Sequence, residues 1–356
     1  MAQPIPNPAK EEPAVSAGVV LNSSSAFRPR LLAKTHWTDP KPEADQILVI
    51  DLSQSNIAAV LLQRKGPDFL LLKQFEEPAS CPIPGRPPLS LRDRLKRFRA
   101  DLNTKMREAI FLIGMEQSLL RNVEMGILER QEIRRILKLS TRHFFQQDMS
   151  DSEFDCFIPA ARANELAQAG KPGNFLVAAA PEKVLAEINS AAEFAGFKAI
   201  QIVPVQVAFA NAALLAKEQL INKDPLVLLH IGTNTSTVSF LFDENITLTR
   251  VIRIGREQLA RALNQARQTP ANLSSEMRSG LIQSNLQHAL TPLAHEIRAA
   301  IDYFEDLYSQ RVSAGFVTGQ IALDDLVIES LQVLEIPCQR INSERLFKAV
   351  ETSRAE

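Results

Sequence analysis

Two short polar segments of the chain carry residue types that can hold phosphate groups. The first, Asp51–Asn56, reads Asp-Leu-Ser-Gln-Ser-Asn, and the second, His230–Thr235, reads His-Ile-Gly-Thr-Asn-Thr. Each lies between two apolar, β-branched runs, so we expect each to form the turn of a β-hairpin. Such turns point backbone N–H groups and hydroxyls at one spot, which suits phosphate oxygens. Two facing copies would clamp a nucleotide between two halves of the molecule.

A third candidate segment is Val317–Gln320, where we expect a short buried strand to run into a helix. Glycine at such a junction lets a planar or phosphorylated group approach the backbone. The candidate nucleotide ligands are therefore Asp51, Ser53, Gln54, Ser55, Asn56, Gly232, Thr233, Asn234, Thr235, Gly319 and Gln320. They matter only if a nucleotide binds. In the alternative interpretation, the turns are fold elements whose hydroxyls cap their own backbone.

The segments that must position these turns form a repeated unit. Apolar runs at 47–52, 57–63 and 68–75 predict three consecutive strands, and apolar residues at a spacing of three and four predict a helix from Leu91 to Met106. The other face of that helix carries Arg92, Arg94, Lys96, Arg97 and Arg99. The pattern returns with strands at 226–231, 236–242 and 246–254 and a helix at 255–268.

Alternating strands and helices are expected in the rest of the chain. Predicted strands are 109–113, 119–125, 154–159, 174–179, 199–203, 315–318 and 336–339. Predicted helices are 129–145, 181–195, 205–220, 286–307, 323–334 and 343–350. The strand at 174–179 is almost entirely apolar, which predicts burial on both of its faces.

Composition excludes several classes of protein. The net charge of -1 argues against a dedicated nucleic-acid binder, which usually has a basic excess. Three cysteines lie far apart without metal-binding spacing, which favours a reducing compartment. No apolar run approaches the roughly 20 residues that span a bilayer, and no secretory signal is visible. Residues 1–45 hold seven prolines and are expected to form a mobile tail. We therefore expect a cytoplasmic protein.

From about Gln46 to Leu346, the order and spacing of these elements resemble the actin-like ATPase superfamily. More narrowly, they resemble the PilM-type family of type IV pilus assembly proteins, which is related in fold to the cell-division protein FtsA. The segments that carry this resemblance are Ile50–Asn56, Leu120–Met125, Phe175–Ala180, Ala195–Phe197, Val227–Gly232, Arg253–Gly255, His295–Phe304 and Phe316–Gly319.

The resemblance implies an α/β, actin-like fold with two ribonuclease-H-like halves around a cleft. It places the first half at 46–113 and 181–225, a small inserted α/β subdomain at 114–180, and the second half at 226–356. The second half includes a helical subdomain at about 256–310. The inserted subdomain resembles the relocated one of this family rather than that of actin or the sugar kinases.

The nucleotide motifs depart from the family pattern at several positions. Ser53 stands where the first turn usually has glycine, and Ala58 stands about where a lysine is usual. His230 replaces the aspartate that begins the second turn, and Gln206 falls where an acidic residue is common. Mg²⁺ prefers hard oxygen ligands, so a histidine is a poor substitute.

Two further positions of the family pattern are altered. The adenosine motif keeps one glycine of a pair, as Gly319 followed by Gln320, and the segment at 274–281 lacks the lysine often found there. Because phosphoryl transfer needs charge neutralisation, a metal and a positioned water, ATP hydrolysis is not expected. Mg-ATP binding remains an open alternative, in which Asp51 would reach the metal only through the nucleotide. No catalytic residue is predicted, and no metal held by the protein itself.

The leading hypothesis is therefore a scaffold. The resemblance implies a protein peripheral to the inner membrane that holds the N-terminal cytoplasmic peptide of a bitopic, PilN-type partner. The groove for this peptide would lie between the first subdomain and the inserted one, and self-association is also open. Alternatives are an ATP-binding or ATP-hydrolysing enzyme of the actin and sugar-kinase superfamily, or the cytoplasmic scaffold of type II secretion, which normally continues into a transmembrane helix.

Overall fold

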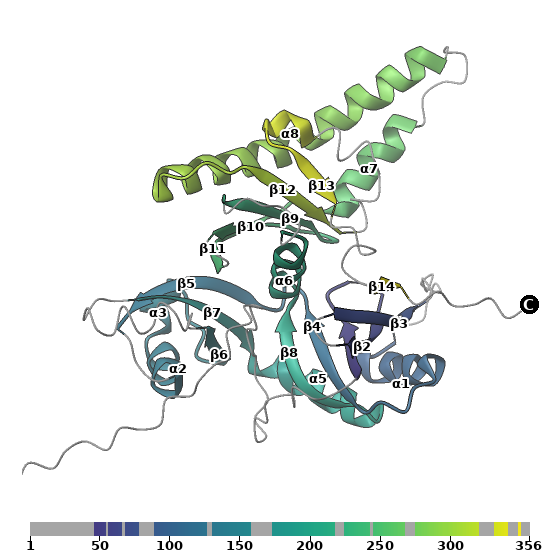
Figure 1. The fold of residues 1–356 in the computed structure, drawn as a ribbon, viewed down its shortest axis with the longest axis vertical. Coiled ribbons are helices and arrows are strands. Elements are labelled where there is room, and N and C mark those ends of the chain that lie inside the picture. Colours follow the sequence, from purple (N-terminus) through teal and green to yellow (C-terminus); the bar gives the residue numbers. More distant parts are fainter. Residues whose placement is uncertain are drawn as a thin grey trace, which may run out of the picture.

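The structure is a computed structural model that describes residues 46–54, 56–65, 68–77, 89–126, 130–157, 173–217, 224–242, 245–267, 275–319, 331–340 and 348–349. The expected tail at 1–45 and the candidate ligands Ser55 and Gln320 lie outside the described residues. The fold contains three sheets, and Figure 1 shows two of them stacked along the long axis with the third to one side.

The first sheet has the strand order β14-β3-β2-β1-β4-β8. Its antiparallel meander is confirmed, and β4 and β8 run parallel to β1. The strands are β1 (Gln46–Asp51), β2 (Ala58–Lys65), β3 (Asp68–Glu76), β4 (Glu108–Ile113), β8 (Lys198–Pro204) and β14 (Lys348–Ala349). The helices α1 (Leu91–Leu102) and α5 (Glu182–Phe194) pack against each other and cover one face.

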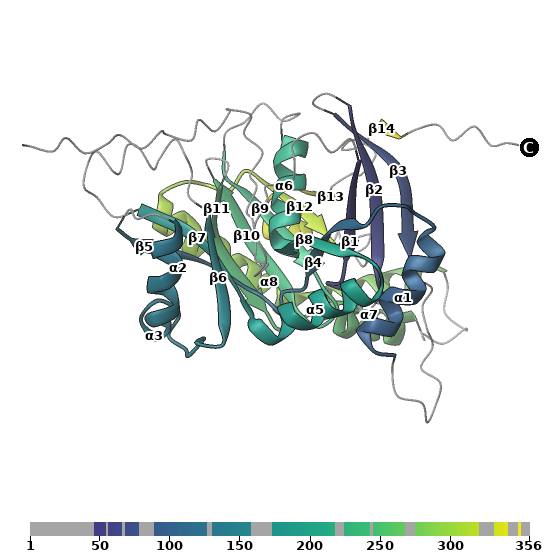
Figure 2. The ribbon, with the colours of Figure 1, turned by 90° about the horizontal axis from the view of Figure 1, so that it is seen from below.

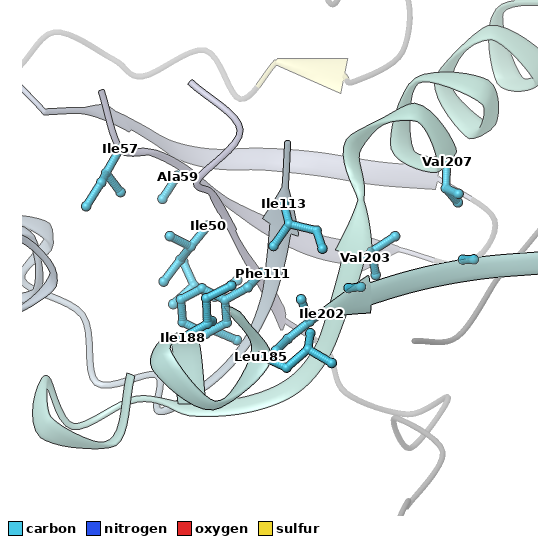
Figure 3. Packing of buried hydrophobic residues seen from close by; sticks show 14 of the residues in the cluster. Ile50, Ile57, Ala59, Phe111, Ile113, Leu185, Ile188, Ile202, Val203 and Val207 are labelled. Carbon is cyan, nitrogen blue, oxygen red and sulfur yellow. The ribbon is translucent and has the colours of Figure 1, made fainter. Parts of the chain in front are cut away.

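Alternation along these strands builds the first core. Ile50 on β1 and Phe111 on β4 point to the same side of the sheet, where Leu185 and Ile188 of α5 meet them (Figure 3). All four side chains are buried, so the period of two in the strands matches the stripe on the helix. Burial of this kind is the main favourable contribution to folding.

The second sheet repeats the first. Its order is β11-β10-β9-β12-β13, in which three antiparallel strands are followed by two parallel ones, as in β3-β2-β1-β4-β8. The predicted duplication is therefore confirmed. The strands are β9 (Leu226–Ile231), β10 (Ser236–Phe242), β11 (Asn245–Ile252), β12 (Ala314–Thr318) and β13 (Cys338–Arg340).

Two long helices follow the second meander. They are α7 (Arg256–Arg267) and the 34-residue α8 (Ser275–Tyr308), which pack on each other, and Figure 1 shows their far ends extending beyond the sheet. One face of α8 is buried in a second core with residues of β9 and β10; it consists of Leu290, Leu293, Ile297, Ile301 and Phe304.

The third sheet, β5-β7-β6, lies between the two parts of the first half in sequence. It consists of β5 (Leu119–Met125), β6 (Ser152–Phe157) and β7 (Gly173–Pro181), and it carries the helices α2 (Arg130–Leu139) and α3 (Thr141–Phe145). Phe175, Val177 and Ala179 pack towards α2 and α3, and Leu176 and Ala178 join the first core. The burial of β7 on both faces is thereby confirmed.

The helix α6 (Val205–Lys217) connects the two large sheets. It contacts β4 and β8 of the first sheet and β9 and β10 of the second, and Figures 1 and 2 show it between them. A further link joins the small sheet to the second one, because Asn122 Nδ2 of β5 donates to the carbonyl oxygens of Ile246 and Thr247 on β11.

Several predicted boundaries were wrong. The first helix ends at Leu102 rather than Met106, because Asn103 adopts a left-handed conformation with φ of 44°. The helix predicted at 129–145 is two helices separated at Ser140. The long helix predicted at 286–307 already begins at Ser275. Lys348–Ala349 pairs with β3 as a strand, not as part of a closing helix.

In the predicted helix at 323–334, residues 323–330 lie outside the described part of the chain, and 331–334 form a 3-10 helix, η2 (Leu331–Leu334). Among the described residues, no helix is long and apolar enough to cross a membrane.

We expect the core between α8 and the second sheet to depend on Phe304, which is fully buried and stacks on Phe240 with 4.6 Å between ring centroids. Replacing Phe304 by alanine removes this contact and leaves a cavity, so the free energy of unfolding should fall by about 3–5 kcal/mol. Guanidinium unfolding measures the change. Tyr303→Ala, on the adjacent 57% exposed residue, is the matched control and should change it by less than about 1 kcal/mol. Equal losses in both variants would contradict this packing.

Candidate functional site

The two polar turns face each other across a cleft of about 270 Å³. Thr233 Oγ1 of the second turn donates a hydrogen bond of 3.4 Å to Gln54 Oε1 of the first, so the turns are in direct contact. The lining residues come from both turns, from the segment after β4 and from the start of α6. They are Leu52, Ser53, Gln54, Gly114, Met115, Glu116, Gln117, Val205, His230, Gly232, Thr233, Asn234 and Thr235.

The first turn is held by its own carboxylate. Asp51 ends β1 and accepts a hydrogen bond of 2.8 Å from the backbone N–H of Ser53. Burial raises the pKa of Asp51, while its hydrogen bonds with Ser53 lower it. The effect of burial is larger, so the pKa of Asp51 lies above its ordinary value. Beneath the turn, a Cβ at Gly114 would lie 3.3 Å from the carbonyl oxygen of Ser53, so β4 ends in close contact with the turn. Asp51 therefore caps its own backbone.

The second turn is held by the helix that follows β11. The carbonyl oxygens of Gly232 and Thr233 accept hydrogen bonds of 2.8 Å and 3.0 Å from the N–H groups of Arg256 and Glu257, the first residues of α7. These N–H groups at a helix N-terminus are the donors that would otherwise attract an anion. A Cβ at Gly255 would lie 2.4 Å from the carbonyl carbon of Asn234, so only glycine fits beside the turn.

His230 lies buried at the end of β9, with 3% of its surface exposed. Its Nδ1 lies 3.0 Å from Thr318 Oγ1, and its ring stacks on Phe209 of α6 with 4.1 Å between centroids and an interplanar angle of 27°. Burial lowers the pKa of His230 to about 3, so the imidazole is neutral at pH 7. A neutral, stacked ring supplies no negative charge for a Mg²⁺ shell or for holding an attacking water.

Met115 occupies the side of the cleft next to the second turn. Its sulfur accepts a hydrogen bond from Thr237 Oγ1, and its terminal methyl carbon would lie 3.3 Å from a Cβ placed on Gly232. A thioether is a weak acceptor with no positive charge, so it contributes nothing to binding a phosphate. Glu116, which is exposed, adds a negative charge to the same lining.

No lysine or arginine lines the described part of the cleft. Ala58, in the position where the resemblance implies a lysine, pairs with Asp51 across the first hairpin and presents only a methyl group. Gln206 is buried at the start of α6, and its Oε1 has no hydrogen-bond partner among the described residues. No group of three or more histidine, cysteine, aspartate or glutamate side chains could hold a metal ion within the described ranges.

The remaining candidates lie beside the cleft rather than along it. Asn56 is half-buried after the first turn and is not one of the lining residues. Gly319 has φ of 108°, and a Cβ there would lie 2.2 Å from the carbonyl oxygen of Ile231, so the chain after β12 passes directly over the end of β9. This close approach requires glycine for a structural reason, without any ligand.

Sequence reasoning missed Phe209, which stacks on His230, and the part of the lining outside the two turns, of which Met115 is one residue. Met115 follows Gly114, the first residue after β4, beside the first turn, and that position was a usable signal. Phe209 lies one turn after the start of an alanine-rich helix, and nothing in the spacing distinguishes it from an ordinary core residue. The lining offers hydroxyl, amide and backbone groups, several of which bond one another, while Ser53 Oγ is buried without a hydrogen-bond partner among the described residues.

The lowered pKa of His230 predicts a pH dependence of stability. Between pH 6.5 and about 3 the unfolded chain binds a proton at this site and the folded chain does not, so its stabilising contribution is present above pH 6.5 and is lost as pH falls. From pH 7 to 5, wild type should lose on the order of 2 kcal/mol more unfolding free energy than His230→Phe. Denaturant unfolding at both pH values measures this difference. The exposed-site variant His295→Gln should behave as wild type; a wild-type pH dependence equal to that of His230→Phe would contradict the neutral, buried imidazole.

Comparison with known proteins gives a fold and no sequence relative. No protein-family model and no curated protein sequence matches the chain. Among solved structures, the chain is similar to one described as the "PilM-PilN type IV pilus biogenesis complex", with a TM-score of 0.68 and 16% identity over 87% of this chain and 92% of the other.

Two other solved structures are more distant. The cytoplasmic domain of EpsL, an inner-membrane component of the type II secretion system of Vibrio cholerae, gives a TM-score of 0.38 at 10% identity over 65% of this chain and 78% of the other. A protein of unknown function with an actin-like ATPase fold from Bacteroides thetaiotaomicron gives a TM-score of 0.47 at 8% identity over 83% of this chain and 90% of the other. The likeness to the PilM-PilN structure and the sheet topology confirm the expected fold. The chain has the actin-like fold of PilM, with two ribonuclease-H-like halves around a cleft and a small inserted α/β subdomain.

Proposed function

We propose that this protein is a PilM-like cytoplasmic scaffold of type IV pilus biogenesis that binds the N-terminal peptide of a bitopic, PilN-type membrane protein. One observation carries the proposal: the likeness to the PilM-PilN structure extends over 87% of this chain and 92% of the other. A likeness of that extent includes residues of both halves and residues on both sides of the small sheet in the sequence.

The chemistry of the cleft favours binding over turnover. Phosphoryl transfer relies on cations that neutralise the phosphates and on a positioned nucleophile. The described lining has no lysine or arginine, a neutral His230 and the thioether of Met115. The N–H groups that begin α7 donate to the second turn itself. The cleft therefore works as a rigid joint, and the function of the chain lies at its surface.

We place the peptide at the seam where α2 of the small subdomain meets α5 of the first half. Lys138 Nζ in the last turn of α2 lies 2.7 Å from Glu182 Oε1, on the first residue of α5, and 3.3 Å from Glu153 Oε1 on β6, so this ion pair links the end of α2 to the start of α5. The next residue, Leu139, is 80% exposed. An apolar side chain beside a charged, fixed seam offers an anchor for an apolar residue of a peptide.

The expected strength follows from the area that a short peptide can cover. A peptide of about ten residues that buries a few hundred Å² of apolar surface gains several kcal/mol at about 25 cal/mol per Å². Part of this gain is lost when the peptide becomes ordered, which leaves a dissociation constant of about a micromolar.

Calorimetry with a synthetic N-terminal peptide of the pilus partner encoded beside this gene tests the proposal. Wild type should bind at about a micromolar, and Leu139→Glu should weaken binding at least about tenfold, because it places a carboxylate at the apolar anchor. Leu281→Glu, at a 40% exposed leucine of α8 in the other half, is the matched control and should bind as wild type. Heat absent at about a hundred micromolar, with a properly folded protein, would sink the scaffold proposal.

The cleft yields a separate prediction for nucleotide turnover. Pure wild-type protein with Mg-ATP should release no phosphate above the no-enzyme background, since the lining supplies neither a cation nor a carboxylate at residue 230. His230→Asp should remain inactive. It introduces a carboxylate at residue 230, but Ala58 still stands where the family pattern has a lysine. Steady release of several phosphates per second by wild type would refute this.

A further inference from the structure

The most strongly charged segment of the chain lies on α1 and the loop after it. Residues 91–107 contain seven lysines and arginines and two aspartates, a net charge of +5 in a chain whose total is -1. Most of these basic side chains are exposed, whereas Leu95, Phe98 and Leu102 of α1 are buried in the first core.

Two of these cations lie over an exposed aromatic ring from the neighbouring helix. Phe194, the last residue of α5, is 40% exposed, and the guanidinium carbon of Arg92 lies 3.6 Å from its ring centroid. Lys96 Nζ, one turn further along α1, lies 5.1 Å from the same centroid. The third residue in this line, Arg99, lies over Phe197 at 4.4 Å. We name Arg92, Lys96, Arg97, Arg107 and Phe194 the basic aromatic patch.

Several of the nearby carboxylates are already engaged. Glu77 pairs with Arg94, Glu108 pairs with Lys198 at 2.9 Å, and Asp93 is hydrogen-bonded to Ser90 at the start of α1. Arg94 and Arg99 serve the fold, since Arg94 holds Glu77 and Arg99 donates to the carbonyl oxygen of Met106. The patch therefore retains its positive charge, and the exposed Asp101 and Glu193 are further acidic residues near it in sequence.

We infer that the basic aromatic patch is a docking surface for an anionic phospholipid bilayer. Charge complementarity supports this occupant, because clustered lysine and arginine side chains are attracted to anionic headgroups. The aromatic ring adds a second match, since an apolar ring such as that of Phe194 beside basic side chains can insert at the boundary of headgroups and acyl chains.

The position of the patch agrees with this inference. Figure 1 shows α1, α5, α2 and α3 along the same lower side of the molecule, away from α7 and α8, and Figure 2 shows that side. The contact with lipid does not depend on the proposed peptide, so the two can be tested separately. If both exist, each raises the effective concentration of the other site at the membrane.

Vesicle flotation of the full chain tests the inference without any partner protein. Wild type should float with vesicles of equal parts phosphatidylcholine and phosphatidylglycerol, and not with pure phosphatidylcholine. Raising salt from about 0.1 M to about 0.5 M should release it, because exposed charges are screened. The double variant Arg92→Glu/Lys96→Glu should lower the partition coefficient at least about tenfold.

Matched variants separate a specific patch from total charge and from misfolding. Arg253→Glu/Arg311→Glu makes the same change in net charge at two exposed residues of the second half, and it should lower partitioning less than about twofold. Arg92→Lys keeps the charge and should bind almost as wild type, and thermal unfolding checks that every variant is folded.

Three results would overturn the inference. They are equal wild-type binding to both kinds of vesicle, equal losses in the two double variants, and binding to soluble poly-glutamate with no binding to anionic vesicles. The last result would assign the patch to an acidic protein partner instead of lipid.

Discussion

The burial of β9 on both faces is the constraint on which the rest of the structure depends. Val227, Leu229 and Ile231 face α8, while Leu226, Leu228 and His230 face the first core and α6. A charged side chain at position 230 would have to be desolvated there at a large cost. The neutral imidazole avoids this cost by stacking on Phe209 and meeting Thr318. His230, the last residue but one of β9, thus joins the two halves through its contact with Phe209 of α6.

The same constraint explains why the cleft is poor in charge. Each turn uses its polar groups internally, through Asp51 in the first and through the N–H groups of α7 in the second. Thr233 and Gln54 close the cleft directly, and Asn122 ties the small sheet to β11. Such mutual satisfaction makes the halves a fixed frame, which suits a protein that presents surfaces to partners.

The duplicated strand order and the long helix α8 could be predicted from the spacing of apolar residues, which recur every second residue in strands and every 3.6 residues in helices. Helix ends were less predictable, since the break at Ser140 and the left-handed Asn103 depend on local backbone conformation that apolar spacing does not encode. At the cleft, sequence indicated the turns and the loss of the usual charges. It missed Met115, Phe209 and the two cations over Phe194, because these are contacts between segments far apart in the chain.

The central claim is that surfaces of this actin-like fold bind partners while its cleft stays inert. A crystal structure of the chain grown with the partner's N-terminal peptide and Mg-ATP together tests it most directly. We predict peptide density at the seam of α2 and α5, with His230 still stacked on Phe209 and no nucleotide between the turns. Nucleotide density between Gln54 and Thr233, with Met115 displaced and no peptide at the seam, would contradict it.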